Sequence, residues 1–228
     1  MTKQELAVEL EKLNLDSSKV DKLEEYMLAT LKANESFNLT AIKDENKFRE
    51  LMILDSAYPL KYFDFSDKKV IDIGTGAGYP GMVLATLSSG EFTLLDSTKK
   101  KIDFISNYAS EHGYFNVKTV VDRAENFAKK HREEFDFAVA RAVSELNVLI
   151  ELILPLLKVG GHFIALKGSK GIEELKSAKK MLEKLGGEVI QIDEYELPHS
   201  HERRVNIIIK KIKETPKKYP REYSEIIK

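Results

Sequence analysis

The segment from Val70 to Gly81 constrains the fold of this chain more than any other part of the sequence. It reads VIDIGTGAGYPG, a short apolar run and then a turn that holds Gly74, Gly76 and Gly78. Glycine allows positive φ angles and lets a ligand approach the backbone closely, and the helix expected after the turn begins with unpaired N–H groups. The segment therefore predicts a nucleotide-cradling loop between a strand and a helix.

A second apolar run, 92–95, ends on Asp96, twenty residues after Gly76. In nucleotide-binding α/β folds a carboxylate at this spacing accepts hydrogen bonds from ribose hydroxyls. The ordinary alternative is that Asp96 only caps the next helix. Together with the glycines, Asp96 indicates a ligand that contains a nucleoside.

The glycines alone leave two cofactors open. Gly76, Gly78 and Gly81 match the dinucleotide pattern G-x-G-x-x-G, so a nicotinamide-dependent oxidoreductase is one interpretation. Asp72 favours S-adenosylmethionine, because a carboxylate attracts the ammonium group of its methionine part and repels a pyrophosphate. A strand-to-helix turn without any ligand is the remaining alternative.

Composition is that of a globular protein, with 228 residues, 43% apolar and 32% charged. The lack of cysteine excludes disulfides, thiolate zinc sites and cysteine nucleophiles. His199 and His201 have no third ligand nearby in the sequence, so we expect an exposed loop there and no metal. The sequence shows neither an export signal nor a membrane span, and we expect a cytoplasmic protein.

Charge is distributed unevenly along the chain. Residues 1–35 carry a net charge of −3, whereas residues 199–228 carry +5, on a chain whose total is −1. A basic end suits a nucleic-acid partner as well as a simple solvated tail. Arg203 and Arg204 precede the last expected strand, and their guanidinium groups are candidates for gripping RNA phosphates.

Helices open the chain, and strands then alternate with helices. Thr2 and Glu5 form a potential capping box, an apolar stripe predicts a second helix around Leu23 to Leu31, and a third is expected over 44–60. Strands are predicted at 70–73, 92–95, 117–121, 135–140 and 162–166, with an antiparallel pair at 189–195 and 205–210. This order predicts an α/β fold with a mostly parallel sheet and helices on both faces. We divide it into an N-terminal helical extension (1–66), a core (67–213) and a tail (214–228).

Six separated motifs occur in an order that resembles one known family over nearly the full chain. They are Asn38-Leu39-Thr40, Asp72 to Gly81, Leu94 to Ser97, Arg123-Ala124-Glu125, Arg141-Ala142 and Ala165 to Gly168. The chain is similar in these to the bacterial 16S ribosomal RNA guanine-N7 methyltransferases (RsmG), historically called glucose-inhibited division protein B. The resemblance implies a seven-stranded class I (Rossmann-like) methyltransferase sheet with an antiparallel last strand. It also implies S-adenosylmethionine as donor and 16S rRNA, free or in the small ribosomal subunit, as substrate.

The same resemblance implies the site residues. The donor site would be formed by Asp72, Gly74, Gly76, Gly78, Tyr79, Asp96, Ser97, Thr98, Ala124, Glu125 and Arg141, with Asp96 at the ribose and Ala124 and Glu125 near the adenine. Guanine N7 carries a lone pair and no proton, so we nominate no catalytic acid or base and expect positioning to supply the catalysis. Arg141 and Lys167 would orient the guanine or a phosphate, and Asn38 would contact the base.

Two departures from the family pattern stand out. The family usually has a histidine shortly before an Asp-Ser pair, but Met52 occupies that place before Asp55-Ser56. The family tail is commonly basic and Pro-rich, whereas this chain ends with acidic and apolar residues after Tyr219-Pro220-Arg221. An RNA-binding protein that keeps the methyltransferase fold without catalysis is a further alternative.

Overall fold

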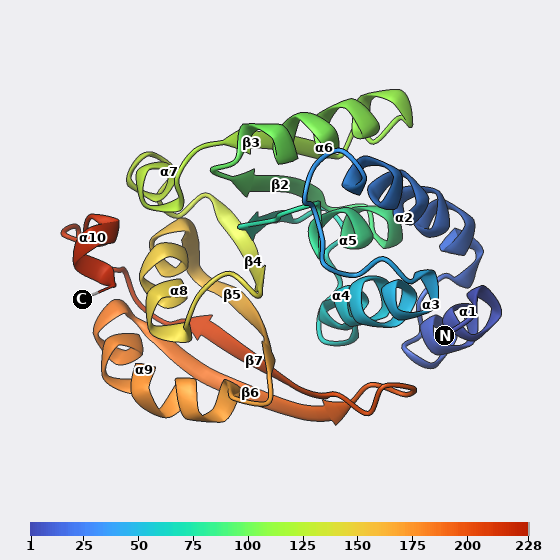
Figure 1. The fold of residues 1–228 in the computed structure, drawn as a ribbon. Helices are drawn as coiled ribbons and strands as arrows, with labels where there is room; N and C mark the ends of the chain where they lie inside the picture. Colours follow the sequence, from blue (N-terminus) through green and yellow to red (C-terminus); the bar gives the residue numbers. More distant parts are fainter. Residues whose placement is uncertain (228) are drawn as a thin grey trace.

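A seven-stranded sheet forms the centre of the computed structural model, which describes residues 1–227; residue 228, the last of the expected tail, lies outside the described residues. The strand order is β3-β2-β1-β4-β5-β7-β6 (Figure 1). The strands are β1 (Lys69–Ile73), β2 (Glu91–Asp96), β3 (Val117–Val121), β4 (Phe135–Arg141), β5 (Leu157–Gly168), β6 (Gly187–Glu196) and β7 (Arg203–Lys211). Strands β1 to β5 are parallel, and β7 is antiparallel to both β5 and β6. The predicted fold class is confirmed.

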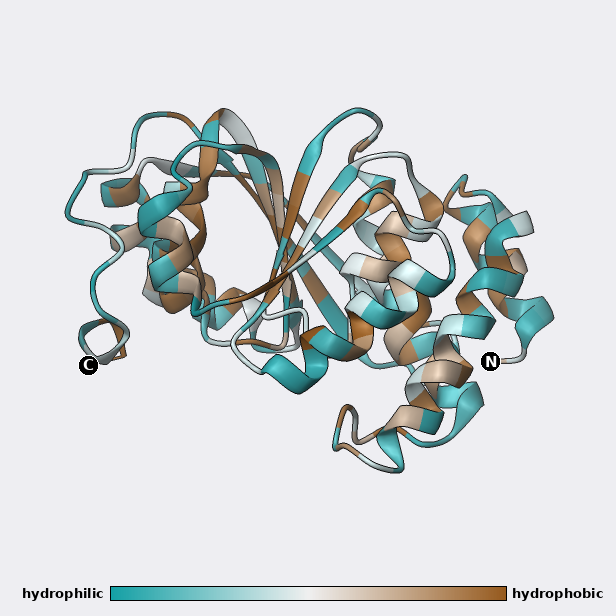
Figure 2. Cartoon of the chain, turned by 90° about the horizontal axis from the view of Figure 1, so that it is seen from above, coloured by the Kyte–Doolittle hydropathy of each residue, from teal (hydrophilic) through white to brown (hydrophobic). Residues whose placement is uncertain are grey.

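Helices cover both faces of the sheet because its parallel strands are apolar on both sides. One face packs against α2 (Val20–Asn34), α5 (Gly81–Leu87) and α6 (Lys99–Glu111), and the other against α7 (Ala124–Lys130), α8 (Leu146–Ile153) and α9 (Gly171–Leu185). Val70 of β1 lies in the first core and its neighbour Ile71 in the second, as alternating strand side chains require. Seen from above, helices flank the sheet and turn their apolar sides inward (Figure 2).

The N-terminal extension packs on the sheet. Its helix α1 (Lys3–Lys12) begins at the predicted capping box, in which the Thr2 hydroxyl accepts from the Glu5 N–H and the Glu5 carboxylate accepts from the Thr2 N–H. Leu6 and Leu10 of α1 belong to the same core as Val70 of the sheet. The proposed boundary at residues 66 and 67 therefore crosses a shared core, and it stays a prediction.

The single α-helix predicted over 44–60 is wrong in detail. The chain is helical there, but it passes through α3 (Glu45–Phe48), a π-helix (Arg49–Leu54), α4 (Asp55–Ala57) and a 3-10 turn (Tyr58–Lys61). Wide π turns are rare and occur often at functional sites, because they redirect side chains and carbonyls of one turn. This π-helix brings Leu51 and Met52 to the large cleft described below.

Shorter elements complete the fold. They are 3-10 turns at Ser17–Lys19 and Leu154–Leu156 and the C-terminal helix α10 (Tyr223–Ile226). In Figure 1 α10 lies beside α7 and α8, so the tail crosses the outside of the second helical layer. Among the residues that the structure describes, no helix is both long and apolar enough to cross a membrane.

Candidate functional site

A cleft of about 1100 Å³ opens at the carboxyl ends of the parallel strands. Its walls come from the segments that follow β1 to β5, together with Leu51 and Met52 of the extension, Arg204 of β7 and Tyr223 of α10. Ligands of open α/β sheets bind at this edge, because the loops there leave a crevice where the strand order changes direction. The cleft is therefore the candidate site.

The glycine loop between β1 and α5 forms the floor of the cleft. Gly74, Gly76 and Gly78 all have positive φ angles, of 69°, 61° and 88°. A Cβ at Gly76 would meet only a carbonyl oxygen 4.0 Å away, so this backbone faces open space. A Cβ at Gly78 would lie 2.2 Å from the hydroxyl oxygen of Tyr26, so this glycine faces α2 and does not line the cleft.

Tyr26 fixes the loop from behind. Its hydroxyl donates a 2.7 Å hydrogen bond to the carbonyl of Ala77, and its ring packs on Tyr79 with centroids 5.4 Å apart. The Tyr79 hydroxyl lies 3.2 Å from that of Thr30, which is also in α2. Tyr79 lines the cleft, and its contact with the cofactor stays a prediction. These contacts with α2 therefore hold the glycine loop in position.

Asp72 lies beneath the loop and is buried. Its Oδ2 accepts hydrogen bonds from the Thr75 hydroxyl (2.6 Å) and the Gly81 N–H (2.8 Å), whereas Oδ1 is buried without a partner in the described residues. Burial raises the pKa of Asp72 to about 6. Asp72 thus braces the turn from below and is not among the residues that line the cleft. Its contact with a methionine ammonium stays a prediction.

Asp96 joins two loops at the cleft. Its Oδ2 accepts from the Gly76 N–H at 3.1 Å and its Oδ1 from the Thr98 N–H at 2.8 Å. Asp96 and Ser97 line the cleft, whereas Thr98 is the N-cap residue of α6 and does not. Each carboxylate oxygen retains a lone pair, so Asp96 can accept further hydrogen bonds beside the open face of Gly76.

The segment after β3 forms a wall of the cleft from both apolar and charged side chains. Ala124 and Glu125 line the cleft at the start of α7, and their contact with the adenine stays a prediction. Glu125 is buried and accepts a hydrogen bond from Nε of Arg123. The Arg123 guanidinium lies over the ring of Tyr223, 4.8 Å from its centroid. This end of the cleft therefore combines the methyl group of Ala124, the buried carboxylate of Glu125 and the ring of Tyr223.

Arg141 reaches from the end of β4 to the π-helix. One terminal nitrogen donates to the Leu51 carbonyl at 2.8 Å, and the other contacts the Met52 sulfur at 3.1 Å. Burial lowers the pKa of Arg141, an effect that Asp55 and Asp72 oppose. Met52, at the place of the family's usual histidine, therefore contacts a cleft arginine.

Asp55 holds two arginines together. Its carboxylate lies 3.7 Å from Arg141 and 3.0 Å from Nε of Arg204, and it accepts a 3.2 Å hydrogen bond from the Tyr195 hydroxyl. Asp55 is only 4% exposed. This buried cluster joins α4, β4, β6 and β7 at the rim of the cleft.

The two arginines predicted to grip RNA differ in their surroundings. Consecutive strand residues point to opposite faces of a sheet. The Arg204 side chain is 15% exposed, lines the cleft and binds Asp55 and Glu202, whereas the Arg203 side chain is 63% exposed and pairs with Glu194. The two arginines therefore have different surroundings, and RNA binding by either of them stays a prediction.

Lys167 and Asn38, which were predicted to contact the RNA substrate, differ in their position relative to the cleft. Lys167 lines the cleft, but its Nζ donates to the Ser144 carbonyl at 2.6 Å and pairs with Glu174 at 2.7 Å. Asn38 is exposed and does not line the cleft, although Leu39 of the same motif does. Residues 1–227 contain no group of three or more His, Cys, Asp or Glu side chains placed to hold a metal ion.

Sequence reasoning missed several contributors to the site. Tyr26, Asp55 and Tyr223 were given no role, although Asp55 is the one charged residue in the apolar run Leu51 to Leu60 and this was a usable signal. Tyr26 looked like an ordinary member of an apolar stripe. Tyr223 lies in the tail, 98 residues after Glu125, and no local pattern links the two.

Comparison with known proteins gives consistent results. The sequence model of the family described as rRNA small subunit methyltransferase G matches residues 19–205. Proteins called ribosomal RNA small subunit methyltransferase G from Lactobacillus acidophilus and Staphylococcus aureus are each 42% identical, over 97% of this chain and 96% and 95% of their own lengths.

Solved structures agree on the fold. A SAM-dependent methyltransferase from Aquifex aeolicus superposes with a TM-score of 0.53 at 19% identity, covering 72% of this chain and 93% of that one. The M. jannaschii TYW2 structure, in complex with AdoMet, has a TM-score of 0.54 at 16% identity, covering 66% and 72% of the two chains. At these identities the likeness shows the Rossmann-like fold alone.

Proposed function

Since this chain belongs to the rRNA small subunit methyltransferase G family, we propose that it transfers the methyl group of S-adenosylmethionine to N7 of a guanine in 16S ribosomal RNA. The observation that carries this proposal is the 42% identity over 97% of the chain. The alternative of a nicotinamide-dependent oxidoreductase is not favoured by these relatives.

The cleft fits the donor. S-adenosylmethionine supplies an electrophilic methyl group on a sulfonium and carries a ribose, an adenine and a cationic ammonium. Open backbone at Gly76 admits a ligand, and Asp96 offers carboxylate lone pairs for ribose hydroxyls. We place the ammonium above the loop, toward the buried Oδ1 of Asp72. We place the adenine beside Ala124 and Glu125.

The reaction does not require the protein to transfer a proton. Guanine N7 attacks through a lone pair and loses no proton, so holding the base in line with the methyl group is the main requirement. Such positioning accounts for roughly 7 to 11 kcal/mol of barrier in well-oriented reactions. Arg141, held by Leu51 and Met52, presents a cation at the strand ends where guanine O6 or a phosphate would be oriented.

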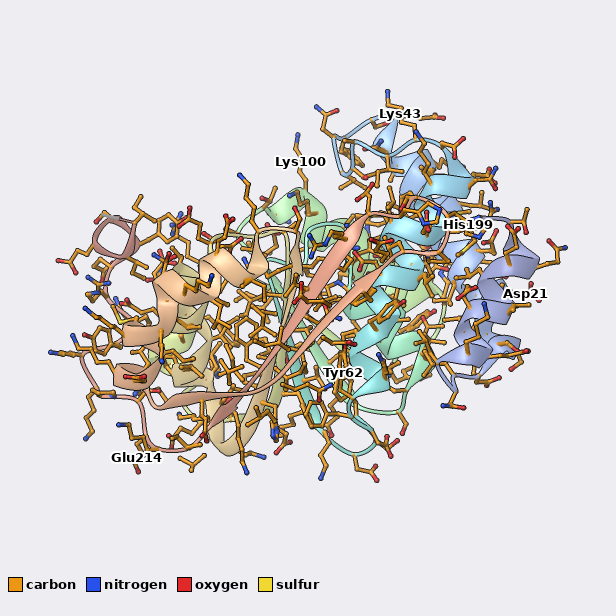
Figure 3. All side chains as sticks on the ribbon, turned by 90° about the horizontal axis from the view of Figure 1, so that it is seen from below. Asp21, Lys43, Tyr62, Lys100, His199 and Glu214 are labelled. Atoms are coloured by element: carbon orange, nitrogen blue, oxygen red, sulfur yellow. The ribbon has the colours of Figure 1, made fainter. Side chains whose placement is uncertain are left out.

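Exposed lysines flank the cleft on the side from which RNA would approach. Lys43 follows Ile42, and Lys100 precedes Lys101; Ile42 and Lys101 both line the cleft. Figure 3 shows Lys43 and Lys100 projecting into solvent on the same side of the molecule. Because phosphate contacts release counterions, we expect RNA affinity to weaken with salt.

The product test uses small-subunit RNA from cells that lack the gene. We expect the protein to transfer labelled methyl from S-adenosylmethionine to that RNA and to create a single new site of cleavage after reduction and aniline treatment. N7 methylation places a positive charge on the base and makes its glycosidic region labile, which explains the cleavage. Naked 16S rRNA and intact small subunits are compared as substrates. Label found only on exocyclic nitrogens, ribose oxygens or protein would contradict the proposal.

Asp96→Ala tests the donor site separately from RNA. Loss of charge-assisted hydrogen bonds of roughly 1.5 to 3 kcal/mol should weaken S-adenosylmethionine binding by about 10- to 150-fold, measured by calorimetry on the folded variant. Asp103→Ala is the control, because Asp103 lies in α6, the helix that follows Asp96, and pairs with exposed Lys99. Equal affinities of the two variants would remove Asp96 from the site.

A further inference from the structure

The C-terminal tail returns to the cleft after β7. Arg132 fixes its path, because its guanidinium donates 2.6 Å hydrogen bonds to the carbonyls of Thr215 and Tyr219. The Tyr219 side chain is buried in the second core. Tyr223 follows in α10 and lines the cleft. The tail is thus part of the packed structure at this point.

A buried carboxylate anchors the tail to α8. Glu151 is fully buried, and its oxygens accept from the backbone N–H of Arg221 at 2.8 Å and from Nε and a terminal nitrogen of its guanidinium at 2.9 and 2.7 Å. A buried charge that loses such a partner is strongly destabilising. The arrangement fixes the chain two residues before Tyr223.

Helix α10 places Tyr223 at one end of the cleft. Ile226 packs with Val148 and Leu152 of α8, and Tyr223 packs against the same cluster beside Ala124. The Arg123 guanidinium connects Tyr223 to Glu125, since it lies over the ring and donates to the buried carboxylate. Tyr223, Ala124 and Leu152 thus line the cleft together with the buried carboxylate of Glu125, and we call this end of the cleft the slot.

We propose that the tail completes the cofactor site and that Tyr223 forms the outer wall against the adenine. This inference rests on the proposed place of the adenine beside Ala124 and Glu125. A flat apolar face with a few polar groups is what purine rings bind, and aromatic side chains pack on bases readily. By linkage, adenine binding and docking of residues 219–227 stabilise each other.

Calorimetry with S-adenosylhomocysteine on the full chain tests the proposal. Tyr223→Ala should weaken binding by about 5- to 150-fold, the range of base–aromatic packing, whereas Tyr223→Phe should keep the parent affinity because it retains the ring. Phe115→Ala is the control, since Phe115 is 99% exposed and lies outside the cleft. Hydrogen exchange gives a second readout: the ligand should slow exchange of amides in 221–227, and Tyr223→Ala should abolish that protection.

Ala124→Leu separates this inference from the adenine placement. Extra bulk in the slot should weaken binding of S-adenosylhomocysteine, and an unchanged affinity would show that the adenine lies elsewhere. Loss of binding in Ala124→Leu together with parent affinity in Tyr223→Ala would overturn the role of the tail alone. If Tyr223→Ala does not fold, the exchange experiment on the parent decides, because unaltered exchange of 221–227 with saturating ligand also overturns it.

Discussion

Asp55→Ala should destabilise the protein by about 3 to 5 kcal/mol, because it leaves two largely buried guanidinium groups without their shared carboxylate. In a chain of this length that corresponds to a fall in Tm of about 6 to 20 °C. Arg141 would retain the Leu51 carbonyl and Arg204 would retain Glu202, so some hydrogen bonding survives. Urea unfolding of parent and variant measures the difference.

Glu194→Ala is the matched control for Asp55→Ala. Glu194 pairs with Arg203, the strand neighbour of Arg204, but both side chains of that pair are about half exposed or more. Exposed ion pairs contribute about 0 to 1 kcal/mol, so the control should change stability little. Equal losses in the two variants would show that burial does not set the strength of the Asp55 cluster.

Gly78→Ala and Gly76→Ala should impair different properties, although both lie in one loop. Gly78→Ala should mainly lower folding stability, and Gly76→Ala should mainly weaken cofactor binding. Gly78→Ala combines the left-handed backbone cost of about 1 to 2 kcal/mol with crowding of about 1 to 3 kcal/mol against the Tyr26 hydroxyl. It should lose about 2 to 5 kcal/mol of folding stability. Gly76→Ala faces open space, so it should lose only the backbone part.

Cofactor binding should reverse this order. The methyl group of Gly76→Ala would project into the open space where we place the donor, so we expect at least a 10-fold weaker affinity for S-adenosylmethionine by calorimetry, about 1.4 kcal/mol. Combining Gly78→Ala with Tyr26→Phe should cost less stability than the sum of the two single changes, since the second removes the crowding hydroxyl. Additive losses would contradict the contact between α2 and the loop.

The regular part of the fold was predictable because its signals are local. Val70 to Ile73 and Phe92 to Leu95 are apolar runs bounded by turn residues, and the Thr2 and Glu5 pair lies within one helical turn. The glycine loop was equally readable, and Asp96 does lie against it. Each of these signals lies within a few residues of the strand, helix or turn that it specifies.

The rest depends on partners that are distant in sequence. Asp55 looked like a helix residue of no special role until β4 and β7 brought Arg141 and Arg204 to it, 86 and 149 residues later. Arg203 and Arg204 looked equivalent, but strand alternation gave them opposite environments. The π-helix also has no sequence signature that periodicity reveals, because its period differs from the α-helix by only a fraction of a residue over one turn.

The clasp between Glu151 and Arg221 has a consequence for biosynthesis. The two residues are 70 positions apart, so at about 5 to 20 residues per second a ribosome adds Arg221 roughly 4 to 14 s after Glu151. Until then, α8 carries a carboxylate whose burial has no cation to balance it. Maturation of this half of the molecule therefore waits until Arg221 has been made, and the wall of the cleft that contains Tyr223 forms after the strands and helices that make up the rest of the cleft.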